Sequence, residues 1–201
     1  MRFLIVSVLL IAPIAQAQTA TTTIHLSPTN HHGEPDESVS NRYDPLWEKC
    51  TAGVLAHKND SETASFCKGA ADVSNDFPPD SRVIERRAAN VYAATAFGNI
   101  GDFKSALPYA DLAVEVVKAA HAGGSGAEAA YMTRAQVKAF AGDLQGGDAD
   151  ATIAEGFARE MIHQGSGVDR LRKDLQFHAD LLRRLGRPED SQKKLAEAAA
   201  L

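Results

Sequence analysis

Apolar residues recur at helical spacing through most of the chain beyond residue 44. Near the C-terminus, residues at i, i+4, i+7, i+11 and i+14 fall on one face of a helix: Leu171, Leu175, His178, Leu182 and Leu185. The helix predicted over 82–100 carries two adjacent apolar stripes, one with Ile84, Ala88, Val91, Ala94 and Gly98, the other with Ala89, Tyr92, Ala96 and Ile100. Stripes on two sides indicate a helix packed between neighbours, because a single helix pair cannot bury both of them.

The chain contains an internal repeat, in which an Ala-rich helix, a glycine turn and a second Ala-rich helix follow one another. The turn glycines Gly101, Gly142 and Gly186 are 41 and 44 residues apart. Counting back 41 residues from Gly101 reaches Asp60, which lies in a polar turn between two helical stretches. Four units are therefore predicted, at about 44–79, 80–122, 126–164 and 168–201. Asp44 is expected to cap the first helix, with Pro45 in its first turn.

The repeat has a characteristic order of small, aromatic and glycine positions, which in the second unit are Ala94, Phe97, Gly101 and Ala106. This pattern resembles tetratricopeptide (TPR) repeats. The later units keep the small residue and the turn glycine, with departures at Lys138, where an aromatic is expected, and at Ser191, where alanine is expected; the first unit diverges most. The resemblance implies an all-α fold, a short right-handed solenoid of about four antiparallel helix pairs over residues 44–201.

The N-terminus has the features of a secretory signal peptide at residues 1–17. Arg2 precedes an apolar run over 3–12, Pro13 follows, and Ala15 and Ala17 supply the small residues of a cleavage site. The run is too short to span a bilayer, so no stable membrane span is expected after cleavage. The alternative is an N-terminal membrane anchor or a buried helix. A cleaved signal predicts that the mature chain begins at Gln18 and is exported, either periplasmic or secreted.

Residues 18–43 have no apolar periodicity and are rich in Thr and then His, which predicts a flexible N-terminal segment. Five of its side chains suit a transition metal: His25, His31, His32, Glu34 and Asp36. Without a fixed geometry they indicate a weak, adventitious site. No metal or cofactor is therefore assigned to the protein.

Composition narrows the classes of function. The chain carries 21 Lys and Arg against 26 Asp and Glu, a formal net charge of −5, which argues against a nucleic-acid partner. Residues 168–201 are locally basic, with 8 basic and 6 acidic groups. This excess fits either a solvated end of a repeat array or a docking patch, and the solvated end is the simpler interpretation because terminal repeats need a polar outer face.

Cys50 and Cys67 are the two cysteines of the chain. They lie at equal distances in sequence from the predicted turn at residues 58 and 59, so in a helical hairpin they would face one another. Together with the predicted export, this favours a structural disulfide that closes the most divergent unit. The alternative is a pair of buried free thiols.

The sequence carries no recognisable catalytic motif, since the spacings of nucleophile elbows, zinc proteases, phosphate loops and dinucleotide-binding loops do not occur. His178 lies on an apolar stripe, which predicts a hydrogen-bonded core histidine in preference to a catalytic one. We therefore expect that the protein is not an enzyme. A small enzyme or accessory subunit whose site forms only in the folded chain remains the alternative.

The TPR resemblance implies a concave face, formed by the first helix of each unit, that binds a peptide or protein partner. Aligned on Ala94, Ala135 and Ala179, this candidate groove contains Val91, Thr95, Asn99, Met132, Gln136, Phe140, Gln176, Asp180 and Arg183. Met132 and Phe140 could equally be core residues, and the Lys and Asn pattern of the family's carboxylate clamp is not evident. A homo-oligomer formed through the C-terminal helix, whose residues 195–201 are small and apolar, is a further possibility.

Overall fold

The computed structural model describes residues 37–78 and 81–201, so the predicted signal peptide and most of the predicted N-terminal segment lie outside the described residues. Within the described ranges the fold is all-α, as predicted, with eight helices and no strand. The helices are α1 (Glu37–Leu55), α2 (Ser61–Ser74), α3 (Val83–Asn99), α4 (Phe103–Ala119), α5 (Gly124–Ala141), α6 (Leu144–His163), α7 (Val168–Arg184) and α8 (Pro188–Ala200).

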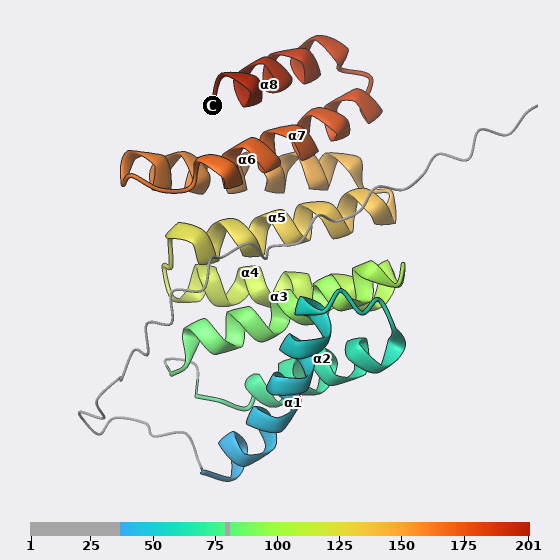
Figure 1. Cartoon of the computed structure of the whole chain (residues 1–201), viewed down its shortest axis with the longest axis vertical. Coiled ribbons are helices and arrows are strands. Elements are labelled where there is room, and N and C mark those ends of the chain that lie inside the picture. The colour runs from blue at the N-terminus through green and yellow to red at the C-terminus, as the bar shows by residue number, and fades with distance from the viewer. Residues whose placement is uncertain (1–36, 79–80) are drawn as a thin grey trace, which may run out of the picture.

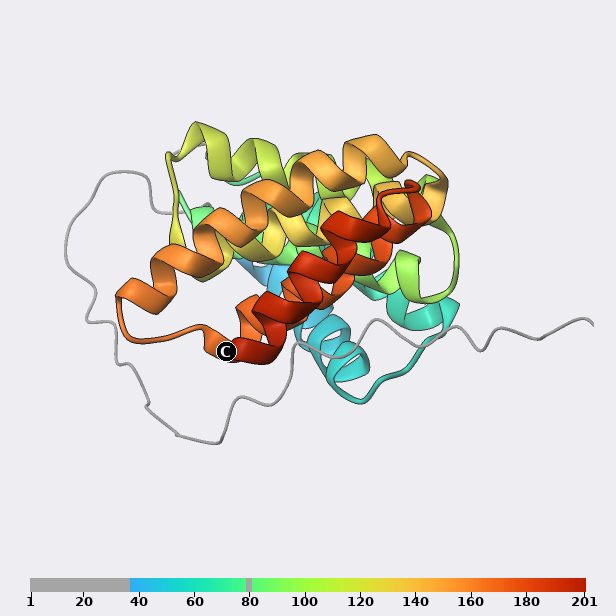
Figure 2. The same ribbon diagram turned by 90° about the horizontal axis from the view of Figure 1, so that it is seen from above.

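Helices that are adjacent in sequence pack against one another, and they follow in chain order along the long axis of the molecule (Figure 1). The predicted units each correspond to two successive helices, α1 and α2, α3 and α4, α5 and α6, and α7 and α8, although α1 and α5 begin before the predicted bounds. The first helices also contact one another across units, α1 with α3 and α3 with α5. Seen along the stack, α8 lies across its end, with the C-terminus at the rim (Figure 2).

The three predicted turn glycines end α3, α5 and α7 in the left-handed backbone region. Their φ angles are 80° at Gly101, 99° at Gly142 and 74° at Gly186. Only glycine adopts this region without a steric cost, which is why the turn residue recurs at each position. After the first two turns, Asp102 and Asp143 cap the next helices, accepting hydrogen bonds from the Ser105 and Gly146 backbone N–H groups at 3.1 and 2.9 Å.

The first helix begins earlier than expected. It starts at Glu37 and continues through Asp44 and Pro45, so the expectation of a flexible segment is wrong for residues 37–43. Burial is the physical reason: the Tyr43 side chain is 1% exposed, and its ring packs on Phe77 at 5.4 Å between centroids. Burial of this aromatic ring offsets part of the cost of Pro45, which lies inside α1 and cannot donate a backbone hydrogen bond.

Small residues make up most of the core, and one covalent link closes its first unit. The cores contain many fully buried alanines, which let neighbouring helices approach closely. The Cys50 and Cys67 sulfurs lie 2.10 Å apart, at disulfide distance, and join α1 to α2. The predicted pairing is therefore confirmed, and the described residues contain no free cysteine.

Candidate functional site

The structure divides the predicted groove residues into buried and accessible groups. Val91 and Met132 are 5% and 6% exposed and belong to one core cluster, against which Phe177 of α7 packs. These two side chains are therefore not available to a partner, and their assignment to the groove is corrected. Val91 of α3 and Met132 of α5 lie in one shared core cluster, where these two helices pack on one another.

The other predicted groove residues retain accessible surface on α3, α5 and α7. Thr95, Asn99 and Gln136 are partly buried, whereas Phe140, Gln176, Asp180 and Arg183 are exposed. Arg183 pairs with Asp180 one turn earlier on the same helix. The charges of α7 at this position therefore neutralise one another, and the accessible surface consists mainly of hydroxyl, amide and aromatic groups.

Phe140 lies in a contact that joins three of the predicted units. Its side chain is 40% exposed, and its ring stacks on the Phe103 ring of α4 with 5.5 Å between centroids. The Arg184 guanidinium of α7 lies 5.9 Å from the Phe140 centroid. The same guanidinium donates a 2.8 Å hydrogen bond to the Ala139 carbonyl oxygen. We call Phe103, Phe140 and Arg184 the Phe140 edge.

Sequence reasoning chose Arg183 for the groove and missed Arg184. The spacing contained the signal, because Arg184 follows Phe140 by 44 residues, the distance that separates Gly142 from Gly186. Phe140 could have been a core residue, but its exposed fraction leaves part of the ring accessible. The Phe140 edge is thus an accessible aromatic and cationic surface held by three helices.

Arg184 differs from every other arginine of α5 to α8. The others each form an ion pair with at least one carboxylate: Arg134, Arg159, Arg170, Arg172, Arg183 and Arg187. Arg184 contacts a carbonyl oxygen and a ring, and no carboxylate of the described residues pairs with it. Among the arginines of α5 to α8, Arg184 is therefore the one whose positive charge no carboxylate of the described residues offsets.

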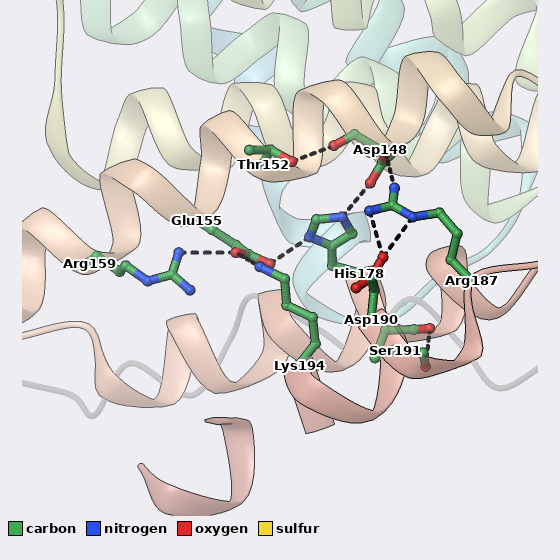
Figure 3. A network of polar contacts seen from close by, with 10 residues as sticks. Asp148, Thr152, Glu155, Arg159, His178, Arg187, Asp190, Ser191 and Lys194 are labelled. Carbon is green, nitrogen blue, oxygen red and sulfur yellow. Dashed lines mark hydrogen bonds and ion pairs between the residues drawn. The ribbon is translucent and has the colours of Figure 1, made fainter. Parts of the chain in front are cut away.

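His178 is at the centre of a buried polar network that joins α6, α7 and α8 (Figure 3). The side chain is 3% exposed, with Nδ1 2.6 Å from Glu155 Oε1 and Nε2 2.6 Å from Asp148 Oδ1. Arg187 pairs with Asp148 at 3.0 Å, and Lys194 of α8 pairs with Glu155. Carboxylate oxygens only accept hydrogen bonds, so the two contacts are satisfied together when both ring nitrogens carry a proton.

The network confirms the interpretation of His178 as a hydrogen-bonded core histidine. Burial by itself would raise the pKa of Glu155, but hydrogen bonds from His178 and Lys194 outweigh it and lower the pKa to about 2. Glu155 is therefore ionised at neutral pH and contacts the His178 ring, Lys194 and Arg159, the last at 3.0 Å. Because Lys194 belongs to α8, its pair with Glu155 links α8 to α6.

An analogous pair of contacts occurs one unit earlier. Arg134 of α5 precedes His178 by 44 residues and lies between Asp111 of α4, at 3.3 Å, and Asp150 of α6, at 2.6 Å. Asp150 also accepts a contact from Lys138 at 2.8 Å. In both units a side chain of the first helix thus binds two carboxylates, on α4 and α6 for Arg134 and on α6 alone for His178.

A second buried cluster pairs two carboxyl groups, Glu128 of α5 and Asp174 of α7, which are 3% and 4% exposed. Arg170 bonds Glu128 at 2.5 Å, while Asp174 Oδ2 has no hydrogen-bond partner. Burial and the negative charge of Glu128 raise the pKa of Asp174 to about 8. Sequence reasoning missed this pair, because no local pattern links two acidic residues on separate helices.

The described residues offer little else for a ligand. They contain no group of three or more His, Cys, Asp or Glu side chains placed to hold a metal ion. A pocket of about 470 Å³ lies between α3 and α4 and is lined by Val83, Arg86, Leu112, Glu115, Val116, Ala119 and Ala120. Among the described helices, none is both long and apolar enough to cross a membrane. Compared with protein-family models and with curated proteins, the chain matches none.

Proposed function

We propose that this protein is an exported, non-catalytic TPR-like module that binds a peptide or a partner protein. In this proposal the four helix pairs form a short right-handed solenoid, and the binding face is built by α3, α5 and α7. The pairing of adjacent helices and the left-handed glycine turns support the repeat architecture. The Cys50–Cys67 pair at disulfide distance is compatible with export, since disulfides persist in oxidising compartments.

The observation that carries the proposal is the Phe140 edge. Aromatic residues and arginine are both enriched at protein interfaces, and this edge exposes a phenylalanine ring beside an arginine with which no carboxylate of the described residues pairs. The buried ionisable groups support a non-catalytic role, because His178 and Glu155 are engaged with one another and have little access to solvent. Thr95, Gln136 and Gln176 would supply the polar contacts around this centre.

Photocrosslinking in cells that export the protein tests the binding face. A photoreactive residue is placed at Gln136 or at Gln176, and as a control at Gln192, an exposed glutamine of α8. We expect a discrete crosslinked partner from the two positions on α5 and α7 and none from Gln192. Equal labelling from all three positions, or none from Gln136 and Gln176, would contradict the proposed face.

Cell fractionation with N-terminal sequencing tests the export. The proposal requires the mature protein outside the cytoplasm with Gln18 as its first residue. A full-length chain in the cytoplasm would contradict export and would leave the binding face to be judged by the crosslinks alone.

A further inference from the structure

The charge and placement of Arg184 identify the kind of segment that the Phe140 edge would bind, an inference that rests on the proposed binding function. Arg184 is held on two sides, by the Ala139 carbonyl oxygen at 2.8 Å and by the Phe140 ring. The hydrogen bond occupies Nη2, so the guanidinium keeps further N–H donors directed away from the carbonyl. A side chain fixed in this way loses less conformational entropy when it binds a ligand.

The groups around Arg184 do not compensate its charge. Arg183 is already paired with Asp180, and Arg187 with Asp148 and Asp190. The Arg183–Asp180 pair is neutral, and Lys193, which also pairs with Asp190, balances the second aspartate bound by Arg187. The guanidinium of Arg184 therefore gives the edge a local positive charge. A carboxylate from outside the chain would neutralise it, whereas a basic partner would be repelled.

The Phe140 ring adds an apolar requirement beside the charge. With 40% of its side chain exposed and its other face stacked on Phe103, the ring offers a fixed apolar surface next to the guanidinium. We propose that the Phe140 edge binds an acidic segment of a partner protein in which an Asp or Glu lies next to an aromatic or aliphatic side chain. The carboxylate receives hydrogen bonds from Arg184, and the apolar side chain packs on Phe140.

Because three different helices supply the side chains of this surface, it exists only in the folded protein. Phe103 comes from α4, Phe140 from α5 and Arg184 from α7. Arginine suits the task better than lysine, because its planar fork matches both carboxylate oxygens. Lys173 provides a matched control, since it is exposed, belongs to the same helix, lies outside the predicted groove and carries the same charge.

Fluorescence anisotropy with defined peptides tests the inference on the exported, disulfide-bonded protein. The probe is a labelled, C-terminally amidated Gly/Ser peptide that contains two Asp-Phe pairs, and its analogue has Asn in place of each Asp. We expect the acidic peptide to bind at least about tenfold more tightly than the analogue at low salt, with a difference that shrinks as salt is added. Arg184→Gln should remove this preference, Arg184→Lys should retain only part of it, and Lys173→Gln should change the affinity less than about twofold.

The outcomes separate the inference from the proposed function. Equal binding of the two peptides, equal losses in Lys173→Gln and Arg184→Gln, or no binding of either peptide would overturn the acidic segment as the ligand. If the crosslinks from Gln136 and Gln176 persist in that case, the binding face stands and only the partner's chemistry is wrong. Urea unfolding of each variant separates a lost contact from a lost fold, and Arg184→Lys keeps the test informative if Arg184→Gln does not fold.

Discussion

The buried carboxyl pair of Glu128 and Asp174 predicts an unusual dependence of stability on pH. The folded protein holds a proton on Asp174 up to about pH 8, whereas an unfolded Asp releases it near its ordinary pKa of 3.8. Between these values the folded state binds one proton more than the unfolded state, so its stability falls as the pH rises and levels off above about pH 8. We expect Asp174→Asn to reduce this fall, because an amide does not titrate and can donate a hydrogen bond to Glu128. Burial also raises the pKa of Glu128, so part of the fall should remain.

The magnitude follows from the proton difference. One extra proton in the folded state changes the free energy of unfolding by about 1.4 kcal/mol per pH unit. Between about pH 5.5 and about pH 7.5, the free energy of unfolding of Asp174→Asn should therefore rise relative to the original protein by about 2–3 kcal/mol. Glu155 does not contribute in this window, since its pKa lies near 2 in the folded protein and it is ionised in both states.

Urea unfolding followed by circular dichroism at several pH values, at constant salt, measures the difference between the two proteins. Histidines titrate in the same range, but both proteins keep them, so their contribution cancels in the difference. Asp180→Asn is the matched control, because this exposed aspartate of α7 pairs with Arg183 at the surface. A stability difference for Asp174→Asn that stays constant with pH, or one that shrinks as the pH rises, would refute the buried protonated carboxyl.

Three further predictions concern the turns, the network and the covalent link. Gly142→Ala forces a side chain into the left-handed region at φ 99° and should lower the stability by about 1–2 kcal/mol. Gly156→Ala, in the interior of α6 with open space around it, should raise the stability by up to about 1 kcal/mol. Thermal unfolding of both variants checks these opposite signs. His178→Ala leaves Glu155 and Asp148 without their shared partner and should cost about 3 kcal/mol or more in urea unfolding, and a loss below about 1 kcal/mol would contradict the network. Replacing Cys50 and Cys67 by serine should cost about 3 kcal/mol, and reduction of the original protein should have a similar effect if the bond forms as the structure shows.

Local rules made much of the helical architecture predictable. The turns after α3, α5 and α7 need a left-handed residue, and that need is met by a glycine at each position, so the spacing of Gly101, Gly142 and Gly186 marks the units directly. The pairing of Cys50 with Cys67 followed from the symmetry of a single hairpin, which again involves residues close in sequence. The start of α1 could not be predicted in this way. Residues 37–43 lack a clear apolar stripe, and they become helical because Val39 and Tyr43 are buried in a core to which α2 and α3 also contribute.

The candidate site depended on contacts between distant residues. Val91 and Met132 lie on the stripe expected for the groove, but α3 and α5 approach so closely that both enter the core. Arg184 acquires its role from Ala139 and Phe140 on another helix, and no property of its own helix separates it from Arg183. The sequence by itself thus determined where the helices begin and end at the glycine turns and which cysteines meet, because adjacent residues encode backbone geometry. Only the tertiary structure decided which side chains are buried and which charges lack a partner, because burial and pairing depend on neighbours supplied by other helices.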